Sequence, residues 1–318
     1  MLMKPGVLVI SHGSREADWV RLVDEAVETV GRSVRWPLAG GRASAAADEA
    51  GKKAAPTDEA GEKPTLPGDA DGKLDSSGDP TEGTLVDDGL PVPVVSSFLE
   101  IVEGRLIQDG IDRLEAEGVT DLYVLPLFVS SGSTHVDDIA QAFGQPPVSA
   151  ERTGELEPFR ISSRTRVHFG APIDDDPVIA ELLYSNIREL SESPARESLL
   201  LIAHGASDAV FQERWRRGMT QLARRLRELG GFAHAEIAML LPDEAASKLQ
   251  ALTQQRPDEA VIVVPLFLSS GYFTRTVIPS RLGELPYRYN GRAMLPHPCV
   301  LRWMERQIGP WLAGLASD

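Results

Sequence analysis

The chain has 318 residues, a formal net charge of −15 at pH 7 and a single cysteine, Cys299. This length allows two domains with separate cores, the charge disfavours nucleic acids and anionic membranes as partners, and one cysteine excludes an intramolecular disulfide framework and an all-cysteine iron–sulfur cluster. No apolar run approaches the length of a membrane-spanning helix, and the N-terminus resembles a strand more than a signal peptide, so we expect a cytoplasmic protein.

Short β-branched runs alternate with longer helical patterns in the first half of the chain. The runs predict strands at residues 6–10, 92–95, 122–126 and 160–167. The helical patterns predict helices at residues 16–34, 100–117, 136–143 and 177–190. Such alternation is typical of a parallel sheet with helices on both faces.

The second half repeats this order. Its predicted strands are residues 199–203, 234–239, 260–265 and 292–295. Its predicted helices are residues 208–229, 243–255, 274–282 and 300–312. We therefore predict an α/β protein of two tandem duplicated domains, residues 1–195 and 196–318, each a four-stranded parallel sheet flanked by helices.

Two sequence blocks carry the duplication. VLVISHGSR at residues 7–15 matches LLLIAHGAS at residues 199–207. LYVLPLFVSSGSTHVDDI at residues 122–139 matches VIVVPLFLSSGYFTRTVI at residues 261–278. The second domain is predicted to be a degenerate copy, because its blocks lack part of the set of polar residues found in the first.

Residues 37–90 form an insertion in the first half only. His12 and Glu100 are 88 positions apart, whereas His204 and Met239, which we match with them, are 35 apart, a difference of 53. The segment is rich in Gly, Ala, Asp and Pro and has almost no large apolar residue. Such a segment cannot offset its ordering entropy, so we predict a disordered loop, with a lid or an interaction segment as the alternative.

Three polar residues of the first half follow consecutive predicted strands. His12, Glu100 and His135 come after the first, second and third strand. Ligands of open α/β sheets bind outside the carboxyl ends of the strands, and two imidazoles with a carboxylate suit a divalent transition metal. Each residue alone also has a structural explanation, such as a hydrogen-bonded strand-end histidine or a carboxylate at a helix N-terminus. Their coincidence on one sheet edge favours a metal site.

The ordered motifs resemble a known family. HGSR at residues 12–15, FLE at 98–100 and PLF…G…H at 126–135 are similar to motifs of the sirohydrochlorin chelatases, which are class II tetrapyrrole metal chelatases with cobalt-, iron- and nickel-inserting members. The resemblance covers nearly the whole chain outside the insertion, in the long two-domain form. It includes a closing strand and helix in each half, at residues 166–183 and 291–305.

The resemblance implies roles for individual residues. His12 matches the metal-binding histidine and proton acceptor, His135 matches the second metal-binding histidine, and Glu100 matches the glutamate of FLE, with Glu103 close enough to compete for that role. Two positions depart from the family pattern. His135 lies farther from the preceding glycine than in many members, and Gly104 stands where a proline is usual.

A chelatase would hold a macrocycle that is rich in carboxylates, so its site needs N–H, hydroxyl and cationic donors. The candidate substrate-binding residues are Ser14, Arg15, Ser130, Ser131, Gly132, Ser133, Thr134 and, from the second half, Arg275. The alternative is that the second-half loop at residues 269–275 is left over from the duplication and packs within the protein without binding the macrocycle.

The remaining histidines carry no partner pattern. His204 corresponds to His12, but Met239 and Thr274 stand where the first half has Glu100 and His135. We therefore expect His204 not to bind a metal. We expect structural roles for the other three, which are His168, His234 and His297.

These features predict a chelatase that inserts a divalent metal into sirohydrochlorin in cobalamin or sirohaem biosynthesis. We expect cobalt or iron, with nickel less favoured, although two imidazoles and a carboxylate suit Co²⁺, Fe²⁺ and Ni²⁺ alike. The metal is a substrate, and no dissociable organic cofactor is implied. The alternative is a non-enzymatic metal or tetrapyrrole carrier. Short family members pair two copies to build a cleft, so the fused duplication favours a monomer.

Overall fold

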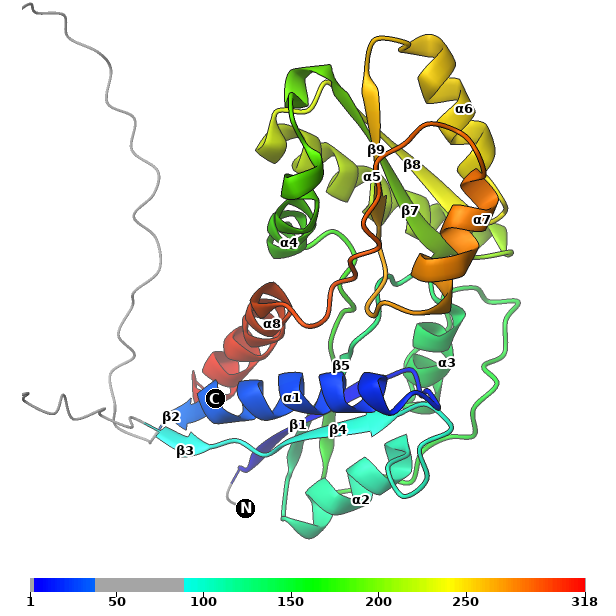
Figure 1. Cartoon of the computed structure of the whole chain (residues 1–318). Helices are drawn as coiled ribbons and strands as arrows, with labels where there is room; N and C mark the ends of the chain where they lie inside the picture. Colours follow the sequence, from blue (N-terminus) through cyan, green and yellow to red (C-terminus); the bar gives the residue numbers. More distant parts are fainter. Residues whose placement is uncertain (1–2, 38–88, 318) are drawn as a thin grey trace, which may run out of the picture.

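The computed structural model describes residues 3–37 and 89–317, which form two α/β units (Figure 1). The first unit has a four-stranded parallel sheet of order β4-β1-β5-β6, and the second a three-stranded parallel sheet of order β8-β7-β9. The strands are β1 (Pro5–Ser11), β4 (Val94–Phe98), β5 (Asp121–Pro126), β6 (Arg166–Phe169), β7 (Glu197–Gly205), β8 (His234–Leu241) and β9 (Ala260–Pro265). The prediction of tandem α/β units with parallel sheets is confirmed.

Helices cover both faces of each sheet. The first half of the chain contains α1 (Ala17–Ser33), α2 (Ile107–Ala116), α3 (Thr134–Ala142) and α4 (Pro177–Ile187). In the second half they are α5 (Ala209–Gly230), α6 (Ala245–Gln255), α7 (Ile278–Leu282) and α8 (Pro298–Ser317). No helix in the described part of the chain is long and apolar enough to cross a membrane.

The central strands are buried on both faces, and their alternation divides the cores. In β1, Val7 and Val9 join a core that includes residues of α1 and α8, whereas Leu8 and Ile10 join a second core with residues of α2 and α3. Side chains of a strand point alternately to opposite faces, so a continuous apolar run serves both cores at once. This is why the runs at the start of each half are reliable signals of strands.

The last helix of each half packs on the other half. Helix α4 packs against α5, and α8 packs against α1 and β5, as the position of α8 beside α1 in Figure 1 shows. One hydrophobic core consequently runs through both units, from Val7 in β1 to Leu199 in β7, and includes the fully buried Trp303 of α8. This exchange of the last helices joins the two units.

The second sheet lacks the fourth strand predicted at residues 292–295. The nearest equivalent is an isolated parallel bridge between Ile262 and Arg288. The Arg288 guanidinium donates hydrogen bonds to the carboxylates of Glu197 and Glu192 and to the carbonyl of Leu190. Backbone groups of the predicted segment instead bond the chain after β9, which makes it a loop and not a strand.

Smaller differences concern the ends of elements. Helix α2 begins at Ile107 and not at residue 100, because a turn follows β4, and β6 begins at Arg166 and not at residue 160. A short antiparallel pair, β2 (Arg35–Pro37) with β3 (Gly89–Pro91), was not predicted. The predicted insertion at 37–90 falls almost wholly outside the described residues.

Candidate active site

Close backbone contact brings the ends of β1 and β4 together. Gly13 follows β1, and a Cβ added there would lie 1.7 Å from the carbonyl oxygen of Glu100. Only glycine allows this approach, because any other side chain would collide with backbone. The contact explains why the residue after His12 is glycine and places Glu100 beside that histidine.

The turn after Glu100 has two residues in the left-handed region. Ile101 has φ 73° and is half exposed, and Gly104 has φ 72°. Proline has a φ fixed near −65° and cannot adopt the conformation of Gly104. The turn of this chain is therefore incompatible with the proline that is usual at this position.

His12 has one ring nitrogen engaged and one open. The Nδ1 atom of His12 lies 2.9 Å from the carbonyl oxygen of Gly13 and 3.7 Å from Oε1 of Glu100. A carbonyl can only accept, so this contact requires the proton on Nδ1 and leaves the Nε2 lone pair available. Trp19 of α1 holds the backbone in place by donating its indole N–H to the carbonyl of His12 at 2.6 Å.

His135 lies in the first turn of α3 and meets His12 edge to face. The two ring centroids are 4.9 Å apart with an interplanar angle of 81°. Burial, followed by the neighbouring charge of His12, lowers the pKa of His135, while the carboxylates of Asp138, Glu100 and Glu155 oppose that shift. A histidine with a lowered pKa is neutral at physiological pH, which is the form that binds metals.

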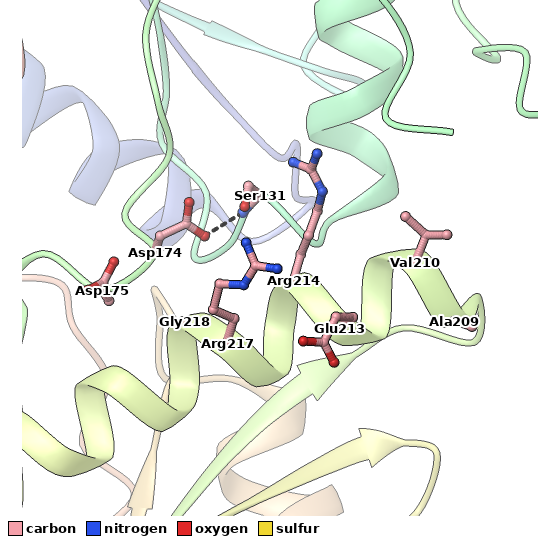
Figure 2. Close-up of a pocket in the computed structure, with 9 residues that line it drawn as sticks. All are labelled: Ser131, Asp174, Asp175, Ala209, Val210, Glu213, Arg214, Arg217 and Gly218. Atoms are coloured by element: carbon pink, nitrogen blue, oxygen red, sulfur yellow. Dashed lines mark hydrogen bonds between the residues drawn. The ribbon is translucent and has the colours of Figure 1, made fainter. Parts of the chain in front are cut away.

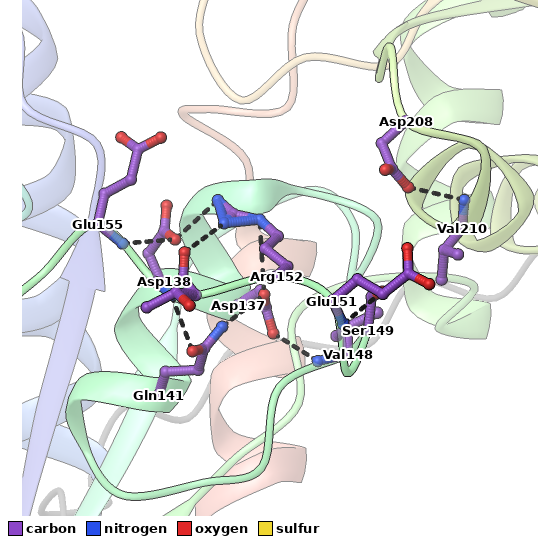
Figure 3. Close-up of polar contacts among 12 residues, drawn as sticks. Asp137, Asp138, Gln141, Val148, Ser149, Glu151, Arg152, Glu155, Asp208 and Val210 are labelled. Carbon is purple, nitrogen blue, oxygen red and sulfur yellow. Dashed lines mark hydrogen bonds and ion pairs between the residues drawn. The ribbon is translucent and has the colours of Figure 1, made fainter.

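An ion-pair network anchors the helix behind His135 (Figure 3). The carboxylates of Asp137 and Asp138 are both buried, and Arg152 approaches them at 3.7 Å and 2.7 Å. The Arg152 guanidinium also lies over the ring of Phe211 in α5, 5.6 Å from its centroid. The position of His135 is thus tied through α3 to the second half of the protein.

The three predicted metal ligands are close to one another but do not form a preformed centre. Within residues 3–37 and 89–317, no three histidine, cysteine, aspartate or glutamate side chains are arranged to hold a metal ion together. One reason is that Nδ1 of His12, the atom nearest Glu100, is already bonded to the carbonyl of Gly13. Of the two candidate carboxylates, Glu100 is the one beside His12, and Glu103 lines a different pocket.

The second half reproduces this geometry with a different partner. His204 contacts the carbonyl of Gly205 at 3.1 Å, and its ring meets Phe273 edge to face at 5.1 Å and 82°. The sequence match pairs His135 with Thr274. That match is wrong, because the ring that contacts His204, as His135 contacts His12, belongs to Phe273. Phe273, the first residue of a π-helical turn (Phe273–Val277), occupies that position, while Thr274 is buried and bonds Gly271.

The match of Glu100 with Met239 is also wrong. Ser11 pairs with Phe98 in the first sheet, and the equivalent Ala203 pairs with Met239 in the second. Met239 therefore corresponds to Phe98, and Leu241 corresponds to Glu100. The glycine contacts agree, because a Cβ on Gly205 would lie 2.3 Å from the carbonyl of Leu241. The spacing from His204 becomes 37, so the difference between the halves is 51 and not 53.

The predicted macrocycle loop is held from two sides. The backbone N–H of Ser131 donates to the carboxylate of Asp174 at 2.7 Å, and the N–H of Gly132 donates to the hydroxyl of Ser130 at 3.0 Å. Gly132 lies directly against α5, where an added Cβ would meet Phe211 and Trp215 backbone atoms within 2.8 Å. Part of the loop is consequently an interface between the two units.

The remaining predicted substrate-binding residues lie in several places. Ser133 precedes α3 and Thr134 begins it, both partly exposed. Ser14 and Arg15 line a separate pocket of about 740 Å³ beside α1, together with Glu103. Arg275 is exposed on the π-helical turn.

The three other histidines lie outside this group. His168 lies 3.9 Å from Asp121 and packs near Trp311, and His234 lies 3.3 Å from Glu236. His297 accepts a hydrogen bond from the N–H of Cys299.

Sequence reasoning missed Asp174, Asp138 and Arg152. Two acidic runs were visible, DDD at residues 174–176 and DD at 137–138, the second directly after the His135 motif. Nothing in the sequence pairs either run with its partner, because Arg152 and Ser131 reach them through tertiary folding.

Comparisons with known proteins agree with this architecture. The CbiX family model matches twice, at residues 84–190 and 198–309, and His12 precedes the first match. No curated protein sequence matches the chain.

Among solved structures, SirB from Bacillus subtilis with Fe³⁺ is 18% identical with a TM-score of 0.64, covering 99% of this chain and 98% of that one. DR2241 from Deinococcus radiodurans, described as a multi-domain protein similar to chelatases with two additional domains, is 19% identical with a TM-score of 0.55, covering 96% of this chain and 54% of that one. CbiX, described as the terminal enzyme of siroheme biosynthesis in denitrifying bacteria, is 15% identical with a TM-score of 0.51, covering 96% and 98%.

The solved structures establish the fold, and the two family matches establish the relationship. Each match falls on one of the two α/β units, and together they span more than half of the chain. The chain therefore belongs to the CbiX family, a family of class II tetrapyrrole chelatases.

Proposed function

We propose that the protein inserts a divalent metal ion, cobalt or iron and with less preference nickel, into sirohydrochlorin in cobalamin or sirohaem biosynthesis. The observation that carries this proposal is the meeting of His12 and His135 beside Glu100 at the carboxyl edge of the first sheet. Neutral imidazoles bind borderline divalent metals without the tight retention expected of thiolates. Such a pair suits a metal that must be passed on.

Metal delivery would use the open nitrogen of His12. The carbonyl of Gly13 fixes the proton of this ring on Nδ1, so Nε2 is the ligand. His135 supports it because burial lowers the pKa of its ring and keeps the imidazole neutral. The incoming metal exchanges water for these nitrogens and then for those of the macrocycle.

Two pyrrole N–H protons must leave as the metal enters. We assign His12 as the principal proton acceptor once the metal has moved to the macrocycle, since its freed imidazole nitrogen can act as a general base. Glu100 assists, because its carboxylate lies 3.7 Å from Nδ1 of His12 and stabilises the protonated ring.

We propose that the second half forms one side of the macrocycle site and does not contain a second metal centre. Phe273 and Leu241 stand where the first half has His135 and Glu100. An aromatic and an aliphatic side chain cannot bind a divalent ion, but they can pack on the face of a macrocycle. We also propose that the protein acts as a cytoplasmic monomer without a dissociable organic cofactor.

An anaerobic insertion assay tests the proposal. Purified protein is mixed with sirohydrochlorin and Co²⁺, Fe²⁺ or Ni²⁺ in turn, and the visible spectrum of the macrocycle is followed. A His12→Ala/His135→Ala variant is the control. Insertion faster than both the control and the spontaneous reaction is expected, and the relative rates rank the metals.

A binding spectrum without acceleration for any metal would contradict a chelatase. It would favour the alternative, a metal or tetrapyrrole carrier on the same scaffold, because a carrier can keep the same ligands. Retention of the full rate in the double variant would instead remove the two histidines from the mechanism.

A further inference from the structure

A pocket of about 640 Å³ lies between the two units, bounded by the Ser131 turn on one side and by α5 on the other. Figure 2 shows two guanidinium groups, of Arg214 and Arg217, extending from α5 toward Ser131. The two residues are three positions apart, so they share one face of the helix. No motif in the sequence drew attention to them.

Both arginines lack a carboxylate partner within the described residues, although the chain carries an excess of acid. Three other arginines of α5 are paired, Arg216 with Glu244, Arg224 with Glu228 and Arg225 with Asp175, whereas Arg227 is exposed outside the pocket. Arg214 and Arg217 therefore line one pocket as two neighbouring cations without an ion-pair partner among the described residues. An anion from outside the chain would neutralise them there.

The acidic residues at the pocket do not satisfy these cations. Asp174 accepts the N–H of Ser131 at 2.7 Å, and burial raises the pKa of its carboxyl group. Asp175 is paired with Arg225 at 2.7 Å. The carboxylate of Glu213 points away from Ser131 in Figure 2. The side of the pocket toward the Ser131 turn is therefore cationic.

The arginines are also held at a fixed position relative to the first-half site. Gly132 fits so closely against α5 that an added Cβ would lie 2.6 Å from the carbonyl oxygen of Phe211. His135 follows the same turn three residues later. A group bound by Arg214 and Arg217 would thus be positioned by the loop that leads into the metal-site histidine.

We propose that Arg214 and Arg217 bind carboxylate side chains of the tetrapyrrole and orient the macrocycle from the second half. This inference rests on the proposed function and identifies a part of the substrate site. A guanidinium can donate two parallel hydrogen bonds to a carboxylate, so a pair of them recognises both charge and direction. The ligand class is a carboxylate attached to a macrocycle that enters between the units.

The test measures equilibrium binding of metal-free sirohydrochlorin by fluorescence, separately from insertion. Arg214→Gln and Arg217→Gln should each weaken binding about tenfold, and the double variant about a hundredfold, as expected for charge-assisted hydrogen bonds. Arg227→Gln is the matched control, because it removes the same charge from an exposed position of α5 outside the pocket. Its binding should stay within about twofold of wild type.

Three further readouts separate the outcomes. Arg214→Lys and Arg217→Lys should restore part of the affinity, and thermal unfolding should confirm that all variants fold. The neutral methyl ester of the macrocycle should bind the double variant and the wild type equally. Equal affinities of the double variant and Arg227→Gln for the acid would overturn the inference and leave insertion untouched. Arginine-dependent binding without insertion would instead contradict the proposed function and leave this site standing.

Discussion

The two halves have the same backbone geometry at the sheet edge and different chemistry on it. His12 and His204 each contact the carbonyl of the following glycine, and each has a ring meeting it edge to face at about 5 Å. In the first half that ring is an imidazole, and in the second it is Phe273. The backbone therefore determines where each histidine lies, whereas the neighbouring side chains determine whether it can bind a metal.

The largest expected difference between the halves is catalytic. His12→Ala should lower the insertion rate by about 10²- to 10⁴-fold, because it removes both a metal ligand and the proton acceptor. His204→Ala should retain the rate within a few fold. Initial rates of insertion with Co²⁺, at equal protein concentration and confirmed folding, check both. A matching loss in His204→Ala would break the comparison.

Exchanging the ring partners tests the same difference by metal binding. His135→Phe should weaken Co²⁺ binding by roughly 100-fold, about 3 kcal/mol, because it removes an imidazole ligand. Phe273→His combined with Leu241→Glu should create a second Co²⁺ equivalent, since the geometry at His204 already matches that at His12. Calorimetric titration gives both stoichiometries. A double variant with unchanged stoichiometry would show that more than these side chains separates the halves.

Substituting equivalent glycines in the two loops should change the stability of the protein by different amounts. Gly132→Ala forces a Cβ against backbone atoms of α5 and should destabilise the protein by about 2 kcal/mol. Gly271→Ala, at the corresponding position, meets no atom within 4 Å among the described residues and should change stability by less than about 0.5 kcal/mol. Denaturant unfolding measures both. Equal effects would contradict the packing of the first loop on α5.

The smallest predicted effect is a shift in the pKa of His135. Asp138 raises the pKa of His135 against the dominant lowering by burial, so Asp138→Asn should lower that pKa further. The neutral ring would then persist to lower pH, and the acid limb of the insertion rate should move to lower pH with it. Proton NMR of the ring gives the pKa. A rise in the pKa of this variant would contradict the electrostatic account; His234 is the internal reference.

Much of this architecture is readable from the sequence because the informative segments are continuous. The apolar runs at residues 7–10 and 199–203 fill two cores at once, and little else produces such runs. The residues that follow them, His12 and His204, could be placed at the sheet edge for the same reason.

The errors arose where tertiary packing decides the register. The sequence match of Glu100 with Met239 is off by two residues, because the insertion before Glu100 removes a fixed spacing from His12, whereas strand pairing identifies Leu241. Equal spacing from Gly132 and Gly271 pairs His135 with Thr274, whereas the ring beside His204 belongs to Phe273, one residue earlier, where a π-helical turn begins. Arg214 and Arg217 were overlooked because an arginine on a helix acquires meaning only from the unit opposite it.

We propose that only one of the two equivalent histidines, His12, receives the metal. Proton NMR of the six histidines during anaerobic titration with Co²⁺ tests it most directly, with each ring assigned by substitution. The account predicts hyperfine-shifted ring signals for His12 and His135 at the first equivalent of metal. A hyperfine-shifted His204 at that point, with His12 unshifted, would contradict it.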